Sequence, residues 1–379
     1  MDDDNRRALR DLLAKQAIAD NLARHSRGVD RADLALLQGA YVQGAHIQGD
    51  KHPDATVAYG LFEGTAADFT TFLVGMQDTL PATLHRTSNM FVRMQGEDAA
   101  ISESYVIAYL ESPGADAHSG GSLQRLVGGR YLDRHRRVGD AWRIEHRTYV
   151  LEWNINHPSR ELAAMFAGPR GAKREQDAGK AQLDAWLARR PQAQASGDQG
   201  RTSMTTGTQD IAHDLDRALS RQALHELMTA YCRGADRGDA PLLASVFHPD
   251  ARVVASGNDG TATDFVASTV ATLRGMQRSF HALSNEWFSI DGDTAVGECY
   301  VIAVLTTPGG DAAQDMLIGG RYIDRFERRA GTWKIAEHVF MQDWNITQPT
   351  TARFNDEFYG SLKLRGGFAP EDPIYAFWK

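Results

Sequence analysis

The chain has little cysteine and no long apolar segment. Only Cys232 and Cys299 occur among its 379 residues, and neither forms a CxxC pair, so we predict neither a disulfide framework nor a thiol metal site. No run of about 18 apolar residues is present, which argues against a membrane-spanning helix. The beginning, MDDDNRRALRDLLAKQAIADN, lacks the apolar core of a signal peptide. We therefore expect a cytoplasmic protein.

Several common catalytic motifs are also missing. The chain contains no GxxxxGK[ST], HExxH or GxSxG motif, and its histidines are dispersed. The glycine pairs at Gly128–Tyr131 and Gly319–Tyr322 lie within strand-like patterns and precede no helix, which does not fit a dinucleotide-binding loop. We predict no metal and no organic cofactor.

The charge pattern narrows the choice of partners. The formal net charge is −8 and the arginines are scattered, whereas nucleic-acid binding depends on clustered basic side chains. Apolar residues make up 42% and charged residues 24% of the chain, as in ordinary globular proteins. We expect neither a nucleic acid nor a membrane as partner.

An internal repeat sets the domain organisation. Residues Leu126–Pro158 and Leu317–Pro349 are identical at 14 of 33 positions without a gap, which indicates a duplicated domain. We place the first domain at 1–167, a flexible linker at 168–207 and the second domain at 208–379. The aromatic end of the second domain is expected to pack over a barrel mouth or a subunit seam.

Within each half, helical spacing precedes alternation of apolar and polar residues. Two helices joined by a matched turn, SRGVDRAD or CRGADRGD, open each half. The predicted long strands are Met90–Met94, Ala100–Leu110, Gln124–His135 and Ala141–Trp153, with counterparts at Glu286–Ile290, Ala295–Thr306, Met316–Glu327 and Thr332–Trp344. Helices followed by an antiparallel sheet are typical of the α+β class.

An aspartate and a histidine recur at matched places in the two halves. Asp30 corresponds to Asp236, where the first helix ends, and His85 corresponds to His281, where the first long strand opens. A carboxylate beside an imidazole fixes the tautomer of the ring and raises the basicity of its free nitrogen, as a general base requires. The alternative interpretation is a structural histidine and a turn-forming aspartate.

Other matched positions are candidates for binding a substrate. They are Tyr105 and Tyr300, His25 and Tyr231, and Arg147 and His338. The two tyrosines in the first pair could line a cavity, although an interface or solvent-facing position is the alternative. The other pairs differ in residue type, so the halves need not share a substrate or both be active.

Three segments of the second half resemble a known family: DLDRALSRQALHELMTAYCRGADRGDAPLLASVFHPDA, FHALSN and LIGGRYIDRFERRAGTWKI. They resemble the SnoaL-like branch of the nuclear transport factor 2 superfamily, especially the hexachlorocyclohexane dehydrochlorinase and scytalone dehydratase group. The resemblance covers about 135 residues in each half and is weaker in the first. It implies tandem cone-shaped α+β barrels, each with a curled sheet that encloses an apolar pocket.

The resemblance also implies roles for individual residues. The base of the dehydrochlorinase pattern, an Asp/His pair, matches Asp30 with His85 and Asp236 with His281. An arginine that stabilises the departing group matches Arg147. The second half departs from this pattern, because His338 takes the place of the arginine.

The implied function is a cofactor-independent lyase. It would be a dehydratase, a related elimination enzyme or a carbon–carbon lyase that removes a proton from a hydrophobic cyclic or aromatic small molecule. An isomerase or cyclase of polyketide or steroid type and a non-catalytic binding module are the alternatives, since one fold supports many functions. We further expect the halves to pack as an internal pseudo-dimer, with a homo-oligomer as an additional option.

Overall fold

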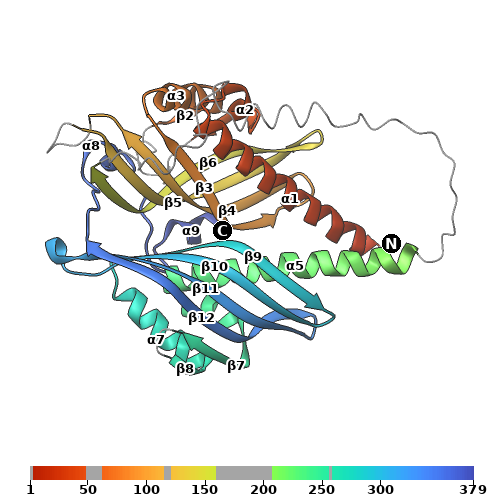
Figure 1. Ribbon diagram of the computed structural model, residues 1–379. Helices are drawn as coiled ribbons and strands as arrows, with labels where there is room; N and C mark the ends of the chain where they lie inside the picture. The colour runs from red at the N-terminus through yellow and green to blue at the C-terminus, as the bar shows by residue number, and fades with distance from the viewer. Residues whose placement is uncertain (1–2, 48–61, 115–120, 159–206, 256–257) are drawn as a thin grey trace, which may run out of the picture.

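Each half of the chain contributes one six-stranded sheet preceded by helices, which confirms the predicted α+β class (Figure 1). The computed structural model describes residues 3–47, 62–114, 121–158, 207–255 and 258–379. Residues 168–206 of the predicted linker lie outside these ranges, whereas Gly207 begins a helix. Within the described ranges, no helix combines the length and apolar character needed to cross a membrane.

The first half runs from helices into a sheet with the strand order β2-β1-β6-β5-β4-β3. Its elements are α1 (Asp3–Asp30), α2 (Leu34–Gln38), β1 (Tyr41–Ile47), β2 (Gly64–Thr65), α3 (Ala66–Asp78), β3 (Thr83–Met94), β4 (Ala99–Ser112), β5 (Leu123–Val138) and β6 (Ala141–Pro158). Strand β1 is parallel to β6, and the other neighbouring strands are antiparallel.

The second half repeats this order as β8-β7-β12-β11-β10-β9. Its elements are α5 (Gly207–Asp236), α6 (Ala240–Ser245), β7 (Phe247–Ala255), β8 (Asn258–Thr261), α7 (Ala262–Arg274), β9 (Arg278–Asp291), β10 (Thr294–Thr306), η3 (Gly310–Ala312), β11 (Gln314–Arg329) and β12 (Thr332–Pro349). A C-terminal tail, residues 350–379, follows and contains α8 (Glu357–Ser361) and α9 (Pro373–Phe377).

The matched turn after the first helix of each half has a packing role. A Cβ atom on Gly28 would lie 2.8 Å from Cγ of Leu37, and Gly234 has an equally close contact with α6. The short helices α2 and α6 begin at capping aspartates, because Asp33 and Asp239 accept hydrogen bonds from backbone N–H groups of the first turn. Close packing between α1 and α2, and between α5 and α6, therefore requires glycine at these two positions.

The repeated glycine pair is explained by aromatic packing. A Cβ atom on Gly128 would lie 2.0 Å from Nε1 of Trp153, and one on Gly129 would lie 2.3 Å from the hydroxyl oxygen of Tyr149. The strand register also shifts between these two glycines. The pair therefore makes room for two rings on opposite faces of the sheet.

The halves pack on each other through the outer faces of their sheets, as an internal pseudo-dimer. Six buried side chains form this interdomain cluster: Tyr105, Trp153, Ile155, Phe280, Ala282 and Val304. The rings of Tyr105 and Phe280 lie 4.8 Å apart, centroid to centroid. Burial of these apolar side chains stabilises the contact between the halves.

The tail crosses from the second half to the first. The N–H of Leu151 donates to the carbonyl of Leu364, and the N–H of Gly366 donates to the carbonyl of Leu151. A Cβ atom on Gly366 would lie 1.8 Å from a carboxylate oxygen of Glu152, so the chain passes very close to the sheet here. The C-terminus lies between the two sheets, beside α9 (Figure 1).

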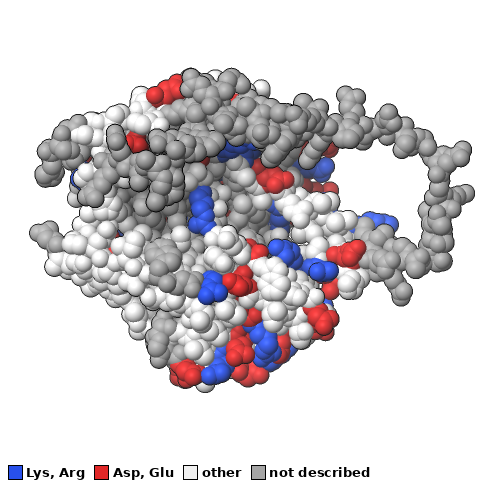
Figure 2. Space-filling model, viewed as in Figure 1, with Lys and Arg blue, Asp and Glu red and all other residues white. Residues whose placement is uncertain are grey.

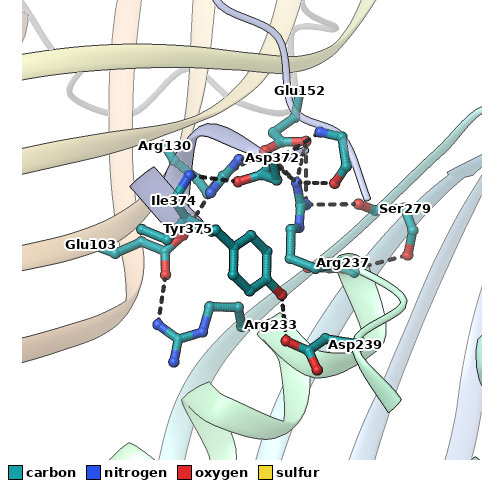
Figure 3. Close-up of polar contacts among 12 residues, drawn as sticks. Glu103, Arg130, Glu152, Arg233, Arg237, Asp239, Ser279, Asp372, Ile374 and Tyr375 are labelled. Carbon is teal, nitrogen blue, oxygen red and sulfur yellow. Dashed lines mark hydrogen bonds and ion pairs between the residues drawn. The ribbon is translucent and has the colours of Figure 1, made fainter. Parts of the chain in front are cut away.

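Buried ion pairs join the tail to both halves (Figure 3). Arg130 lies 2.8 Å from Glu103, 2.5 Å from Glu152 and 2.6 Å from Asp372. Arg237 lies 3.0 Å from the same Glu152 and 2.8 Å from the same Asp372. We call these five residues the interdomain ion cluster. Each of its side chains is almost completely buried.

The position of Asp372 shows why this cluster holds the tail. Its carboxylate also accepts hydrogen bonds from the N–H groups of Gly367 and Ile374, both at 2.9 Å. Burial raises the pKa of Asp372, but Arg130 and Arg237 outweigh that effect and hold the pKa well below its usual value. Buried charges persist only when paired, so loss of one partner is strongly unfavourable.

We predict that Asp372→Asn lowers the free energy of unfolding by about 3 kcal/mol, because it leaves two buried arginines with one carboxylate fewer. Chemical denaturation followed by tryptophan fluorescence measures the change. Charges of both signs are mixed on the face of the molecule shown in Figure 2. Asp259→Asn, in the exposed pair with Arg252, is the matched control and should cost less than about 1 kcal/mol. Equal effects of the two variants would contradict a special role for the cluster.

Candidate functional site

The first Asp/His pair forms where α1 meets β3. Asp30 is the last residue of α1, and its Oδ1 lies 2.7 Å from Nδ1 of His85. The other carboxylate oxygen accepts the backbone N–H of His85 at 2.8 Å. The side chains of Asp30 and His85 are 7% and 12% exposed. By accepting these two hydrogen bonds, the carboxylate of Asp30 fixes the position of the start of β3 and the orientation of the His85 ring.

The second pair has the same geometry with one further contact. Asp236 ends α5, and its Oδ1 lies 2.6 Å from Nδ1 of His281 while its Oδ2 accepts the backbone N–H of His281 at 3.0 Å. The hydroxyl of Ser279 also donates to Asp236, at 3.0 Å. Burial opposes ionisation of Asp236, but His281 and its hydrogen bonds outweigh burial and lower the pKa of Asp236.

This geometry leaves one ring nitrogen of each histidine available. A carboxylate that accepts Nδ1–H keeps the proton on that nitrogen, so the lone pair of Nε2 is free to accept a proton. His85 and His281 each line a cavity, and each exposes only about an eighth of its side chain. The structure therefore brings Asp30 to His85 and Asp236 to His281.

The first cavity is mainly apolar. Its volume is about 130 Å³, and apolar side chains of α3 and β4, such as Phe69, Phe72 and Val106, form much of its wall. His25 and Arg147 line it together with His85. A small apolar cavity with few polar groups is typical of a site for a hydrophobic small molecule.

The second cavity is larger and carries more hydroxyl groups. Its volume is about 230 Å³. Three residues of α7 that line it, Ser268, Thr269 and Thr272, take the places of Phe72, Leu73 and Met76 in the first cavity. Each exchange replaces an apolar side chain with a hydroxyl. The two cavities therefore share an Asp/His pair and differ in polarity.

Arg147 is held by buried polar partners at the first cavity. Its guanidinium donates to both carboxylate oxygens of Asp133, each at 2.8 Å, and lies 3.9 Å from the ring centroid of Tyr131. A further nitrogen of the guanidinium lies 3.0 Å from Nδ1 of His25. Burial and the nearby charge of Arg147 lower the pKa of His25 well below its usual value, so His25 is neutral at pH 7.

His338 takes the place of Arg147 in the second half but is shielded from the cavity. Its Nδ1 lies 2.6 Å from Asp324, and the ring is completely buried. The rings of Tyr231 and Tyr322, which do line the second cavity, lie 4.9 and 5.0 Å from it. Burial raises the pKa of Asp324. The Asp324–His338 pair therefore replaces the Asp133–Arg147 pair.

The structure corrects the expectation that Tyr105 and Tyr300 line a cavity. The neighbouring residues Val106 and Val301 face the cavities, so the tyrosines lie on the outer faces of the sheets. Tyr105 is 1% exposed because it packs in the interdomain cluster, whereas Tyr300 is 45% exposed. Alternation alone shows which residues share a face and does not show which face is inside.

The first half also contacts the strand that carries His281. Asn89, on β3, donates from Nδ2 to the carbonyl of His281 and accepts the N–H of Leu283, both at 2.7 Å. Its φ of 45° is in the left-handed region that asparagine tolerates. The counterpart Asn285 has a φ of 50° but is exposed. Support across the interface therefore runs from the first half to the second at this point.

Sequence reasoning missed several residues at these sites. Asp133 and Asp324 follow the repeated glycine pair at the same spacing, so the repeat itself contained a signal for them. Asn89 and Asn285 are matched as well.

Among the residues that the structure describes, no group of three or more His, Cys, Asp or Glu side chains lies close enough together to hold a metal ion.

Comparison with known proteins identifies the family. The model of the SnoaL-like domain family matches residues 10–148 and again residues 216–339. Since these ranges make up more than half of the chain, the chain belongs to the SnoaL-like domain family and contains two copies of its domain. The predicted family resemblance is thereby confirmed. No curated protein matches the chain.

Solved structures similar to the chain correspond to a single copy of the domain. The hexachlorocyclohexane dehydrochlorinase LinA-type3 from Novosphingobium barchaimii LL02 is 27% identical, with a TM-score of 0.32, over 36% of this chain and 94% of that chain. A protein from Novosphingobium aromaticivorans, provisionally assigned as a scytalone dehydratase, is 18% identical, with a TM-score of 0.32, over 41% and 93% of the two chains. A variant of a Mycobacterium tuberculosis protein of unknown function is 23% identical, with a TM-score of 0.29, over 33% and 77%.

A second buried histidine near Arg147 generates a prediction about pH. Burial lowers the pKa of His135; Asp133 opposes this shift and Arg147 adds to it, and the resulting pKa is about 4. The usual value is about 6.5 in an unfolded chain. Below that pH the unfolded state binds a proton that the folded state excludes, so stability falls as pH decreases.

We predict that His135 alone removes on the order of 3 kcal/mol of unfolding free energy between pH 6.5 and 4. His135→Gln should reduce the slope of stability against pH in this window, as measured by urea denaturation at several pH values. His157→Gln, at an exposed position, is the control and should keep the wild-type slope. An unchanged slope in His135→Gln would show that this histidine is protonated in the folded protein.

Proposed function

We propose that this protein is a cofactor-independent lyase that eliminates a small group from a hydrophobic cyclic or aromatic molecule. The observation that carries the proposal is the buried carboxylate held 2.6–2.7 Å from Nδ1 of a histidine whose ring lines a cavity, in both halves. This pair supplies a base without any metal or cofactor. Similarity to a hexachlorocyclohexane dehydrochlorinase supports the reaction class only as an analogy.

The first cavity provides a complete set of groups for elimination. Nε2 of His85 takes a proton from a substrate carbon, and the electrons of that C–H bond form a double bond as the leaving group departs from the neighbouring carbon. Asp30 stabilises the imidazolium that forms. The positive charge of Arg147 at the cavity wall favours departure of an anion, and the proton then passes from His85 to the leaving group or to water.

The second cavity favours a different outcome of the same proton abstraction. The counterpart of Arg147 is His338, which is bound to Asp324 and separated from the cavity by Tyr231 and Tyr322. Without a cation at the wall, loss of an anion has less support. An isomerase or cyclase, in which the base returns the proton elsewhere on the substrate, is therefore the second candidate function for this half.

The proposal predicts that His85→Ala lowers the elimination rate by about 10²–10⁴-fold, because general bases contribute that much. Hexachlorocyclohexane and cyclic β-hydroxy ketones form the substrate panel, and mass spectrometry distinguishes loss of a fragment from isomerisation without change of mass. His281→Ala tests the second half in the same way. His213→Ala, on the exposed face of α5, should leave turnover unchanged.

Two results would contradict the proposal. One is unchanged turnover in both His85→Ala and His281→Ala. The other is tight binding of the panel without any turnover by the wild-type protein, which would indicate a binding module in which the Asp/His pairs are structural hydrogen bonds.

A further inference from the structure

The wall of the first cavity contains two residues that do not belong to the first half. Phe358 and Leu362, in and just after α8 of the tail, line this cavity together with residues between His25 and Tyr149. Leu362 is buried against apolar side chains of the first sheet, including Ala108 and Leu110, which also line the cavity. The second half thus contributes to the wall of the first cavity.

Several contacts hold this part of the tail in place. Tyr359 lies between the two lining residues in the sequence and is completely buried. Its hydroxyl donates to the side-chain carbonyl of Asn156 at 2.9 Å. Asp356 caps α8 by accepting the N–H of Tyr359 at 2.7 Å. The guanidinium of Arg125 lies 5.1 Å from the ring centroid of Phe358. The positions of the two lining side chains are therefore determined by buried and polar contacts.

The described part of the second cavity has no equivalent contribution. All of its lining residues lie between Tyr231 and Phe340, within the second half itself. Its volume is about 230 Å³, against about 130 Å³ for the first cavity. The tail side chains thus occupy space at one cavity and not at the other.

We propose that Phe358 and Leu362 determine the substrate size of the first cavity and restrict it to molecules with a single apolar ring. The inference rests on the proposed function in one respect, namely that the cavity receives a hydrophobic cyclic molecule. Apolar pockets discriminate by volume, since a surplus methylene group must displace a packed side chain. Truncation of either side chain opens the cavity toward a second ring.

Equilibrium binding tests this proposal without requiring any reaction. Because both cavities are apolar, the second is first closed with Ala303→Phe, a buried lining position whose counterpart in the first cavity is Ala108. Cyclohexanol and decahydro-2-naphthol serve as one-ring and two-ring probes. Isothermal titration calorimetry then measures both affinities in this background.

We expect Ala303→Phe to bind cyclohexanol more tightly than decahydro-2-naphthol. Addition of Phe358→Ala or Leu362→Ala should shift the ratio of the two affinities by about tenfold or more toward the two-ring alcohol. Phe368→Ala is the matched control, because Phe368 lies in the same tail, packs on Arg274 and does not line the cavity. This control should leave the ratio unchanged.

Near-ultraviolet circular dichroism establishes that each variant is folded. Phe358→Leu and Leu362→Val, made separately, provide milder truncations at the two positions. An unchanged affinity ratio in folded variants at both positions would overturn the proposal, as would an equal shift in Phe368→Ala. Since binding of the alcohols does not depend on proton transfer, the affinity ratio reports on the size of the cavity and not on turnover. The size proposal can therefore fail while the lyase proposal holds, and the lyase proposal can fail while the size proposal holds.

Discussion

The interdomain ion cluster is the constraint on which the arrangement of this molecule depends. Arg130 from the first sheet and Arg237 from the end of α5 share Glu152 and Asp372, so one buried set of charges connects both halves and the tail. Removal of any member leaves a buried charge without its partner, which is costly in a medium of low polarity. Because Arg237 directly follows Asp236, the same cluster lies beside the carboxylate of the second Asp/His pair.

The two halves have diverged around a shared design. Both keep a helix-terminal aspartate bonded to a histidine at the start of a long strand, but the outer faces of the sheets differ. Leu132, packed against the tail residue Ile374, is 2% exposed, whereas its counterpart Ile323 is 41% exposed. At this position the tail thus covers the first sheet and leaves the second exposed. The contact of Asn89 with the strand of His281 runs in the opposite direction, so each half contributes to the candidate site of the other.

Much of this architecture could be predicted from the sequence, because duplication makes each half a check on the other. The helix ends, the α+β order and both Asp/His pairs follow from matched positions. For the first long strand, alternation was recognised only at Met90–Met94, although His85 was expected to open the strand; β3 spans Thr83–Met94. Its first residues are largely polar and show no clear alternation, since the strand is stabilised there by the carboxylate of Asp30 and by pairing with β4. Local pattern carries no signal for such long-range partners.

By itself, the sequence determined the family, the duplication and the residues of the two Asp/His pairs, because these depend on residue types that recur at matched positions. Only the tertiary structure decided which face of each sheet encloses a cavity and that Tyr105 and Tyr300 lie outside. The aromatic tail was expected at a barrel mouth or a subunit seam, and only the structure showed that it lines the first cavity. The physical reason is distance along the chain. Phe358 reaches the first cavity through buried contacts between residues about 200 positions apart, such as Tyr359 with Asn156, and no local periodicity encodes a contact of that range.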